Sequence, residues 1–220
     1  MAPQVMYDPE GVIKYQLDFE LAPALDERKI SMLNNWRTLL HQMNLIGQEE
    51  GRYGGLGYGN ISERFCTFDG KPTQEFVISG TQTGHIHHLD ENGYVLVVTC
   101  DPGKNYMMAK GPIKPSSEAM THATLYQLSD TIGAVIHVHS PVIWRCADQL
   151  RIAVTGPNVP YGTPEMSLAI QELFHQGAFS KQKVFAMLGH EDGVVSFGHD
   201  IENAGQELIK ILAMAIQNFK

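Results

Sequence analysis

The chain has 220 residues, of which 43% are hydrophobic and 18% are charged, and it carries a formal net charge of -8. This length can bury the core of one domain, and the negative charge argues against a general binder of nucleic acid or anionic membranes. Three scattered cysteines form neither a disulfide framework nor a CxxC metal motif. No apolar run reaches the roughly 18 residues of a membrane span, and the first residues lack a signal-peptide pattern, so we expect a cytoplasmic protein.

Two parts are predicted along the chain: an N-terminal arm over residues 1–25 and one α/β domain over residues 26–220. Prolines interrupt the first part, so we expect an irregular arm that packs on the surface or against a neighbouring subunit. Within the domain, residues 26–48 predict an amphipathic helix and residues 51–60 a glycine-dense loop. The apolar positions of that helix are Met32, Trp36, Leu39, Leu40, Met43 and Ile46. Strands are expected at 61–68, 75–80 and 93–100.

The second half of the chain alternates predicted helices and strands. A helix over 114–128 begins with Pro115 and Ser116, which are both common at helix starts. A helix over 163–176 has Thr163 as its N-cap. The other expected elements are a strand over 132–140, a short helix from Pro141, two strands within 183–198 joined at Asp192-Gly193, and a closing helix over 201–219.

Two histidines stand two residues apart in an otherwise apolar strand. His137 and His139 would project from one face with Cα atoms about 6.6 Å apart, so both can reach one metal ion. The alternative is a pair of buried imidazoles that hydrogen-bond within the core. His190 follows a predicted strand and is a third candidate ligand. Three histidines with an open coordination position are typical of a catalytic metal site.

Several polar residues near predicted helix starts and turns have two interpretations. Glu118 is a candidate acid/base, although acids also favour helix N-termini for electrostatic reasons. His122, one turn later, is interpreted as a partly exposed helix residue. The loops at 59–62 and 79–84 and the pair Ser116-Ser117 suit either caps and turns or the binding of an anion. The HIHH run at 85–88 is interpreted as a solvated loop in preference to a ligand set.

Six motifs occur in the order seen in the class II aldolase/adducin family. The family includes fuculose- and rhamnulose-phosphate aldolases, ribulose-phosphate 4-epimerase and methylthioribulose-phosphate dehydratase, and the chain resembles it from about residue 30 onward. The resemblance implies an α/β/α sandwich around a largely antiparallel sheet, in a ring-shaped homotetramer with sites between subunits. The motifs are GNIS (59–62), ISGTQTG (78–84), KPSSE (114–118), HVHS (137–140), VPYGTPE (159–165) and GHEDGVVSFG (189–198).

The resemblance also implies roles for individual residues. His137, His139 and His190 resemble the ligands of zinc or another divalent metal, and Glu118 resembles the acid/base. Tyr161 is a candidate proton shuttle, with an ordinary packed tyrosine as the alternative. The residues that resemble the phosphate-binding loops are Asn60, Ser62, Gly80, Thr83, Gly84, Ser116 and Ser117.

The function implied is that of a zinc-dependent lyase. It would cleave or form a C–C bond in a small hydroxy-ketone or a sugar phosphate through a metal-stabilised enediolate. The sequence departs from the family pattern at Gly57, where aldolases commonly have threonine, in the longer 79–84 loop, and in GHEDG, which replaces NHG. Whether the substrate carries phosphate therefore stays open. The alternatives are a sugar-phosphate 4-epimerase or dehydratase on the same site, and a non-catalytic, adducin-like assembly module.

Overall fold

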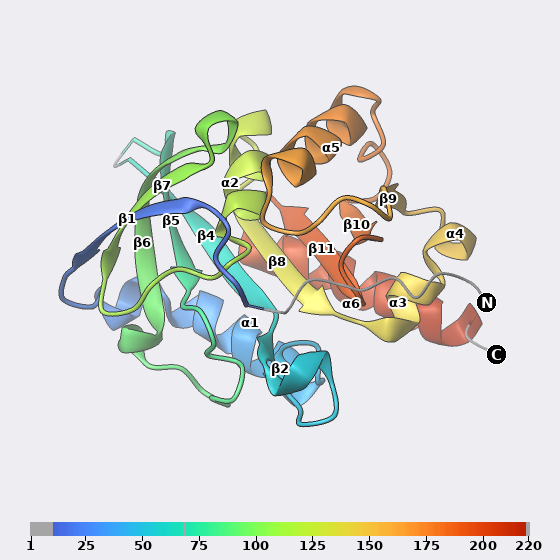
Figure 1. The fold of residues 1–220 in the computed structure, drawn as a ribbon, viewed down its shortest axis with the longest axis horizontal. Coiled ribbons are helices and arrows are strands. Elements are labelled where there is room, and N and C mark those ends of the chain that lie inside the picture. The colour runs from blue at the N-terminus through green and yellow to red at the C-terminus, as the bar shows by residue number, and fades with distance from the viewer. Residues whose placement is uncertain (1–10, 68, 219–220) are drawn as a thin grey trace.

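A mixed β-sheet forms the middle layer of the molecule (Figure 1). A computed structural model describes residues 11–67 and 69–218, and over these residues the main sheet has nine strands in the order β1-β7-β6-β5-β4-β8-β11-β10-β9. The strands are β1 Gln16–Leu21, β4 Asn60–Cys66, β5 Pro72–Ser79, β6 Tyr94–Asp101, β7 Tyr106–Gly111, β8 Ala134–His139, β9 Ala153–Thr155, β10 Val184–Met187 and β11 Gly193–Gly198.

The strand directions differ between the interior and the edges of this sheet. From β7 through β10, every neighbouring pair is antiparallel. Both edge strands are parallel to their neighbours, β1 to β7 and β9 to β10. The sheet is therefore mixed, and the largely antiparallel arrangement that was expected describes its interior and not its two edges.

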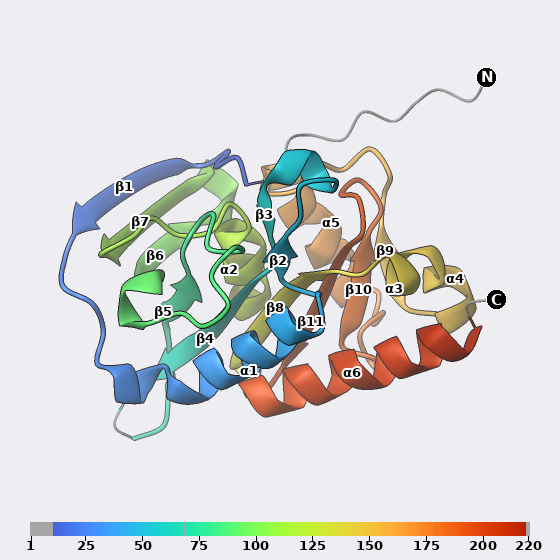
Figure 2. The ribbon, with the colours of Figure 1, turned by 90° about the horizontal axis from the view of Figure 1, so that it is seen from below.

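Helices cover both faces of the sheet. Helices α1, α3, α4 and α6 lie along one face, as Figure 2 shows for α1 and α6, and α2 and α5 cover the other. This arrangement gives three layers, as expected for an α/β/α sandwich. No helix of the described residues is long and apolar enough to cross a lipid bilayer. The helices are α1 Ser31–Gln42, α2 Ala119–Leu128, α3 Pro141–Arg145, α4 Ala147–Leu150, α5 Pro164–His175 and α6 Ile201–Asn218.

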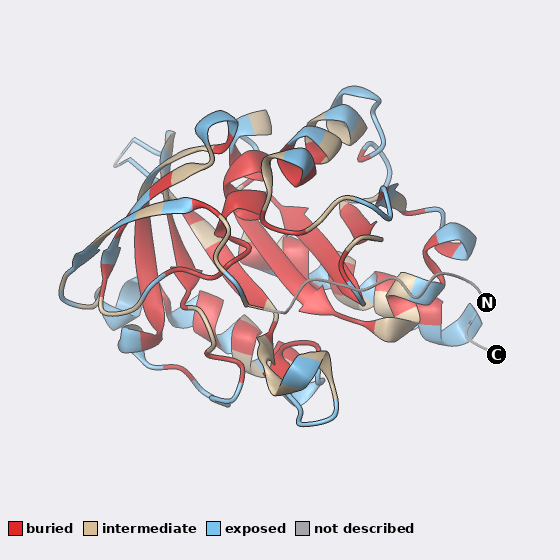
Figure 3. Cartoon of the chain, in the orientation of Figure 1, coloured by how far each residue is buried: buried red, intermediate tan, exposed pale blue. Residues whose placement is uncertain are grey.

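Strand β8 runs through the centre of the molecule, and all six of its residues are buried (Figure 3). Alternate side chains enter the two cores on either side of the sheet, because successive residues of a strand face opposite ways. Ile136 and Val138 join the core under α1 and α6, whereas Val135 joins the core under α2 and α5. His137 and His139 share the face of Val135, so the fold places both imidazoles in the layer between the sheet and α2.

Helix α1 is shorter than predicted and buries only part of the predicted apolar face. It begins at Ser31, after a 3-10 turn over Glu27–Lys29. Leu33 and Leu40 are buried on it together with Arg37, whereas Met32 of the predicted apolar face is 54% exposed. The reason is that Arg37 donates hydrogen bonds to the carbonyl oxygens of the 83–87 loop, which gives the buried face a polar edge.

The expectation of an irregular arm is wrong for residues 16–21, which form the edge strand β1. Leu17 and Phe19 alternate with exposed residues and pack on the core beside β7. Residues 1–10 of the predicted arm lie outside the described residues. The short strands β7 and β9 were not predicted either, whereas α5 begins at the predicted Thr163 cap, whose Oγ1 accepts a hydrogen bond from the Met166 amide.

Candidate active site

Three buried histidines meet on the α2 side of the sheet. His137 and His139 come from β8, and His190 comes from the connection between β10 and β11. One possible ligand nitrogen of each lies within 4.8 Å of those of the other two, and no other group of this kind occurs in residues 11–67 and 69–218. Three imidazoles form a donor set that suits zinc and other divalent transition metals. The structure thus brings together all three predicted ligands.

Backbone pairing fixes the positions of these histidines. In the β8–β11 register, Gly193 lies opposite His139 and Val195 lies opposite His137. A Cβ atom on Gly193 would stand 3.1 Å from Cγ of the His190 ring, so the absence of a side chain leaves room for this ring. The chain therefore uses two strands and one tight connection to assemble the group.

Glu118 approaches the three histidines from the turn before α2, which faces the sheet. The PSSE segment forms a turn before α2, which begins at Ala119, later than the predicted start at residue 114. Glu118 is fully buried, and its Oε1 lies 3.4 Å from Nδ1 of His190. Neither carboxylate oxygen has a hydrogen bond of normal geometry within the described residues. A buried carboxylate without such bonds needs a cation nearby, and a metal held by the histidines fits that need.

The protonation of Glu118 and His139 suits a metal site. Burial opposes ionisation of Glu118, but its contact with His190, the charges of His137 and His190 and the nearby Thr121 together lower the pKa of the carboxyl. Burial, followed by the proximity of His190 and His137, holds the pKa of His139 well below its usual value. Glu118 is therefore a carboxylate, and His139 is neutral, which is the form that binds metals.

Tyr161 lies behind the metal-ligand candidates and is 1% exposed. Its ring is stacked near His190, with the ring centroids 4.5 Å apart, and its hydroxyl accepts a hydrogen bond from the Val12 amide. The ammonium of Lys14 lies 3.8 Å from the centre of the same ring. The ring thus supports His190 and ties it to the segment before β1, as the packed alternative expects. Its role as a proton shuttle stays a prediction.

One polar cavity gathers most of the residues predicted to bind an anion. Residues 80–84 of the 79–84 loop line it, and so does Gly57. Gln82 spans part of the cavity, since its Oε1 accepts a hydrogen bond from the Gly57 amide at 3.1 Å. The predicted residues that line it are Asn60, Gly80, Thr83, Gly84, Ser116 and Ser117.

Ser62 does not belong to that cavity. Its Oγ lies 2.7 Å from Nδ1 of His122 and 2.6 Å from the Tyr126 hydroxyl, inside the core. His122 is also fully buried, so the interpretation of a partly exposed helix residue is wrong. Burial is the main cause that lowers the pKa of His122 to about 3, and the imidazole is therefore neutral. Ser62, His122 and Tyr126 thus form a row of polar contacts between α2 and the sheet, in the turns of α2 that follow Glu118.

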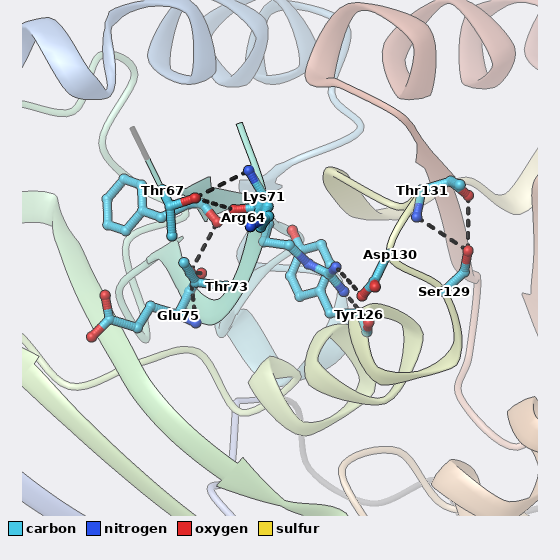
Figure 4. Close-up of polar contacts among 10 residues, drawn as sticks. Arg64, Thr67, Lys71, Thr73, Glu75, Tyr126, Ser129, Asp130 and Thr131 are labelled. Atoms are coloured by element: carbon cyan, nitrogen blue, oxygen red, sulfur yellow. Dashed lines mark hydrogen bonds and ion pairs between the residues drawn. The ribbon is translucent and has the colours of Figure 1, made fainter. Parts of the chain in front are cut away.

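Arg64 anchors the far end of that row. Figure 4 shows its guanidinium between Tyr126 and Asp130: Nη2 donates to the Tyr126 carbonyl oxygen, and Nη1 lies 3.5 Å from Asp130. The guanidinium carbon also lies 4.9 Å from the centre of the Tyr126 ring. Because Tyr126 belongs to the last turn of α2, Arg64 ties this helix to β4. The helix that presents Glu118 at its start is therefore held at its end.

The glycine-dense loop at 51–60 packs over His139. The sequence did not predict this contact. The Tyr53 ring lies 4.4 Å from that of His139, and its hydroxyl donates to Oδ2 of Asp192 at 2.7 Å. Arg52 donates to the same hydroxyl and to Glu49. Asp192 belongs to the GHEDG segment that departs from the family pattern. The signal that was available was the presence of two tyrosines, Tyr53 and Tyr58, in a loop rich in glycine.

The histidines of the 85–88 run lie along α1 and take no part in the metal group. All four residues of the run are exposed. Nδ1 of His88 lies 3.1 Å from the Thr38 hydroxyl, and the His87 ring packs edge-on against His41. The interpretation of this run as a solvated loop is confirmed.

Comparison with known proteins assigns the family. The sequence model described as the Class II Aldolase and Adducin N-terminal domain matches residues 49–216. The chain belongs to this family. The matched residues include every metal-ligand candidate, Glu118 and all the residues predicted to bind an anion.

Solved structures of other class II aldolase-family proteins share the fold. A sugar-phosphate aldolase from Thermotoga maritima aligns with a TM-score of 0.62 and 18% identity, over 86% of this chain and 92% of that chain. An L-fuculose-1-phosphate aldolase from Thermus thermophilus gives 0.61 and 16%, over 86% and 92% of the two chains. A further L-fuculose 1-phosphate aldolase gives 0.60 and 19%, over 90% of each. These similarities show a mixed α/β domain of the class II aldolase type.

Removal of the Tyr53 hydroxyl should loosen the loop over His139. Tyr53→Phe keeps the ring but deletes the hydrogen bonds to Asp192 and Arg52. Because hydrogen bonds to charged groups contribute about 1.5–3 kcal/mol, amide hydrogen exchange over residues 52–58 should become roughly 10-fold faster or more. Tyr106→Phe on β7 is the matched control. Equal protection of the loop in all three proteins would contradict this role of Tyr53.

Stability at acid pH should depend on His122. Its pKa is about 3 in the fold and 6.5 in the unfolded chain, so the unfolded chain binds a proton that the folded chain does not over this range. The free energy of unfolding therefore falls as the pH falls from 6.5 toward 3. In His122→Gln it should fall less steeply, by about 1.4 kcal/mol per pH unit, in urea titrations. The exposed substitution His175→Gln is the control, and equal slopes in His122→Gln and wild type would contradict the assignment.

Proposed function

We propose that this protein is a metal-dependent lyase of the aldolase type, which cleaves or forms a C–C bond in a small hydroxy-ketone or sugar phosphate. The observation that carries the proposal is the buried group of His137, His139 and His190 with the Glu118 carboxylate 3.4 Å from His190. The structural relatives named as sugar-phosphate and fuculose-phosphate aldolases support the same reaction class.

The three histidines would hold the metal, and zinc suits three imidazoles with an open position once all three are neutral. A divalent ion bound there supplies a Lewis acid that polarises a substrate carbonyl. Burial lowers the pKa of His139 and so holds its imidazole in the neutral form, which can bind a metal ion. The loop that carries Tyr53 and the ring of Tyr161 exclude water from two sides of the histidines.

Glu118 would move the proton at the substrate carbon next to the carbonyl. The carboxylate is ionised in the fold and therefore accepts a proton, as a general base must. Its backbone amide is held by Oγ of Ser116, and α2 is fixed at its far end by Arg64. A base mounted on a rigid turn keeps its distance to the reacting atom constant, which general acid–base catalysis requires.

The loops around the polar cavity would hold the end of the substrate remote from the bond that reacts. The cavity measures about 10 Å³ in this structure, so the Gln82 side chain that spans it would have to move to admit such a group. Ser116 and Ser117 line the cavity and directly precede Glu118 in the chain, so the cavity and the base share one turn. Its lining consists of glycines, hydroxyls and amides. Groups of this kind bind phosphate or hydroxyl groups without a cationic side chain.

A non-catalytic assembly module is the alternative from another class. Such a module has no need to bury three histidines and a carboxylate together, because burial of each polar group costs free energy unless it is paired. The polar centre therefore favours the enzyme. The ring-shaped homotetramer and the cytoplasmic location stay predictions.

The test is an assay of C–C cleavage and condensation with Glu118→Gln. Free hydroxy-ketones and their phosphates, each offered with short aldehydes, are the substrates. The wild type should react, and Glu118→Gln should be about 10²- to 10⁴-fold slower, since it loses the base but keeps the shape of the side chain. Glu191→Gln, an exposed acid one residue after His190, is the control. Wild-type protein that neither cleaves nor forms a C–C bond would contradict the proposal, as would equal rates in wild type and Glu118→Gln.

A further inference from the structure

Asn60 and His137 face each other across two central strands. In the β4–β8 register these two residues are direct partners, so their side chains share one face of the sheet. Nδ2 of Asn60 lies 3.1 Å from Nδ1 of His137. The two residues are 4% and 0% exposed. Strand pairing, and not a loop, therefore fixes the contact between this amide and a candidate metal ligand.

The neighbouring donors and acceptors determine which way the Asn60 amide is oriented. With Nδ2 facing His137, Oδ1 of Asn60 is buried without a hydrogen-bond partner. The oxygen and nitrogen of an amide have nearly the same shape, and their assignment follows from the surrounding network. A half-turn of the amide places Oδ1 against Nδ1 of His137, where it accepts a hydrogen bond, and frees Nδ2 as a donor.

The orientation of Asn60 decides which nitrogen of His137 is available to a metal. A neutral imidazole carries one proton, so a proton on Nδ1 leaves the lone pair of Nε2 for a ligand bond. A partner that accepts from the non-ligating nitrogen orients the ring and makes it a better ligand. An amide that donates to Nδ1 would put the proton on Nε2 and oppose metal binding there.

We propose that Asn60 is a positioning residue for His137: its Oδ1 accepts the Nδ1–H and holds the imidazole in the tautomer that offers Nε2 to the metal. The inference rests on the metal site of the proposed function. It gives Asn60 a task that is separate from the phosphate contact implied by family resemblance. It also predicts that a substitution at this position changes metal affinity in the absence of any substrate.

Zinc affinity measured by competition with a chromophoric chelator tests the proposal. Asn60→Leu has a similar volume but no acceptor, and zinc should bind about 10- to 100-fold more weakly. Asn60→Asp can only accept, and its affinity should equal or exceed that of the wild type. Ser62→Ala is the matched control: Ser62 lies two residues along β4, is as deeply buried, and contacts His122 and Tyr126. Its zinc affinity should be unchanged.

The tautomer itself is visible by ¹⁵N NMR of the histidine rings in the zinc-free wild type, where no bond to a metal fixes the position of the proton. The His137 proton should lie on Nδ1 and exchange slowly with solvent. A proton on Nε2, or wild-type zinc affinity in Asn60→Leu, would overturn the proposal, and so would equal losses in Asn60→Leu and Asn60→Asp. The wild-type spectrum decides the matter even if a variant fails to fold. Wild-type protein without zinc affinity would overturn the proposed function as well, so the two failures are distinguishable.

Discussion

Strand β8 hydrogen-bonds to β4 on one side and to β11 on the other, and this pairing prevents its two histidines from leaving the protein interior. Because alternate side chains of a strand face opposite ways, the same register that buries Ile136 and Val138 under α6 directs His137 and His139 toward α2. A slip of one residue would bring the imidazoles into the apolar core on the other face. The geometry of the site is therefore a consequence of sheet register.

Burying so many polar groups imposes a second constraint, because each of them needs a partner. Glu118 lies beside His190, the ring of Tyr161 covers His190, and Tyr53 lies over His139. These partners come from segments far apart in the chain, and each segment is fixed elsewhere: Arg64 holds α2, and Asp192 holds the glycine-rich loop. The polar centre thus connects the segment before β1, the layer of α2 and α5, the glycine-rich loop and the sheet. The fold and the candidate chemistry depend on the same contacts.

Local patterns in the sequence revealed the centre of the site and missed its surroundings. The spacing of His137 and His139 predicts one shared face, because period-two alternation is a local rule. The pairing of Tyr53 with Asp192 joins residues 139 positions apart, and the buried side of α1 depends on hydrogen bonds from Arg37 to a distant loop. No local pattern encodes such contacts. The burial of His122 was missed for the same reason, because its partner Ser62 lies on another element.

Elemental analysis of the purified protein measures whether His137, His139 and His190 hold a divalent metal. We expect about one zinc or other divalent ion per chain, removable by a chelator and restored by added zinc. In His139→Ala, this stoichiometry should fall toward zero. A folded wild-type chain that contains no such ion and takes up none from solution would show that the three histidines are not a metal site. So would a His139→Ala protein that keeps the full complement.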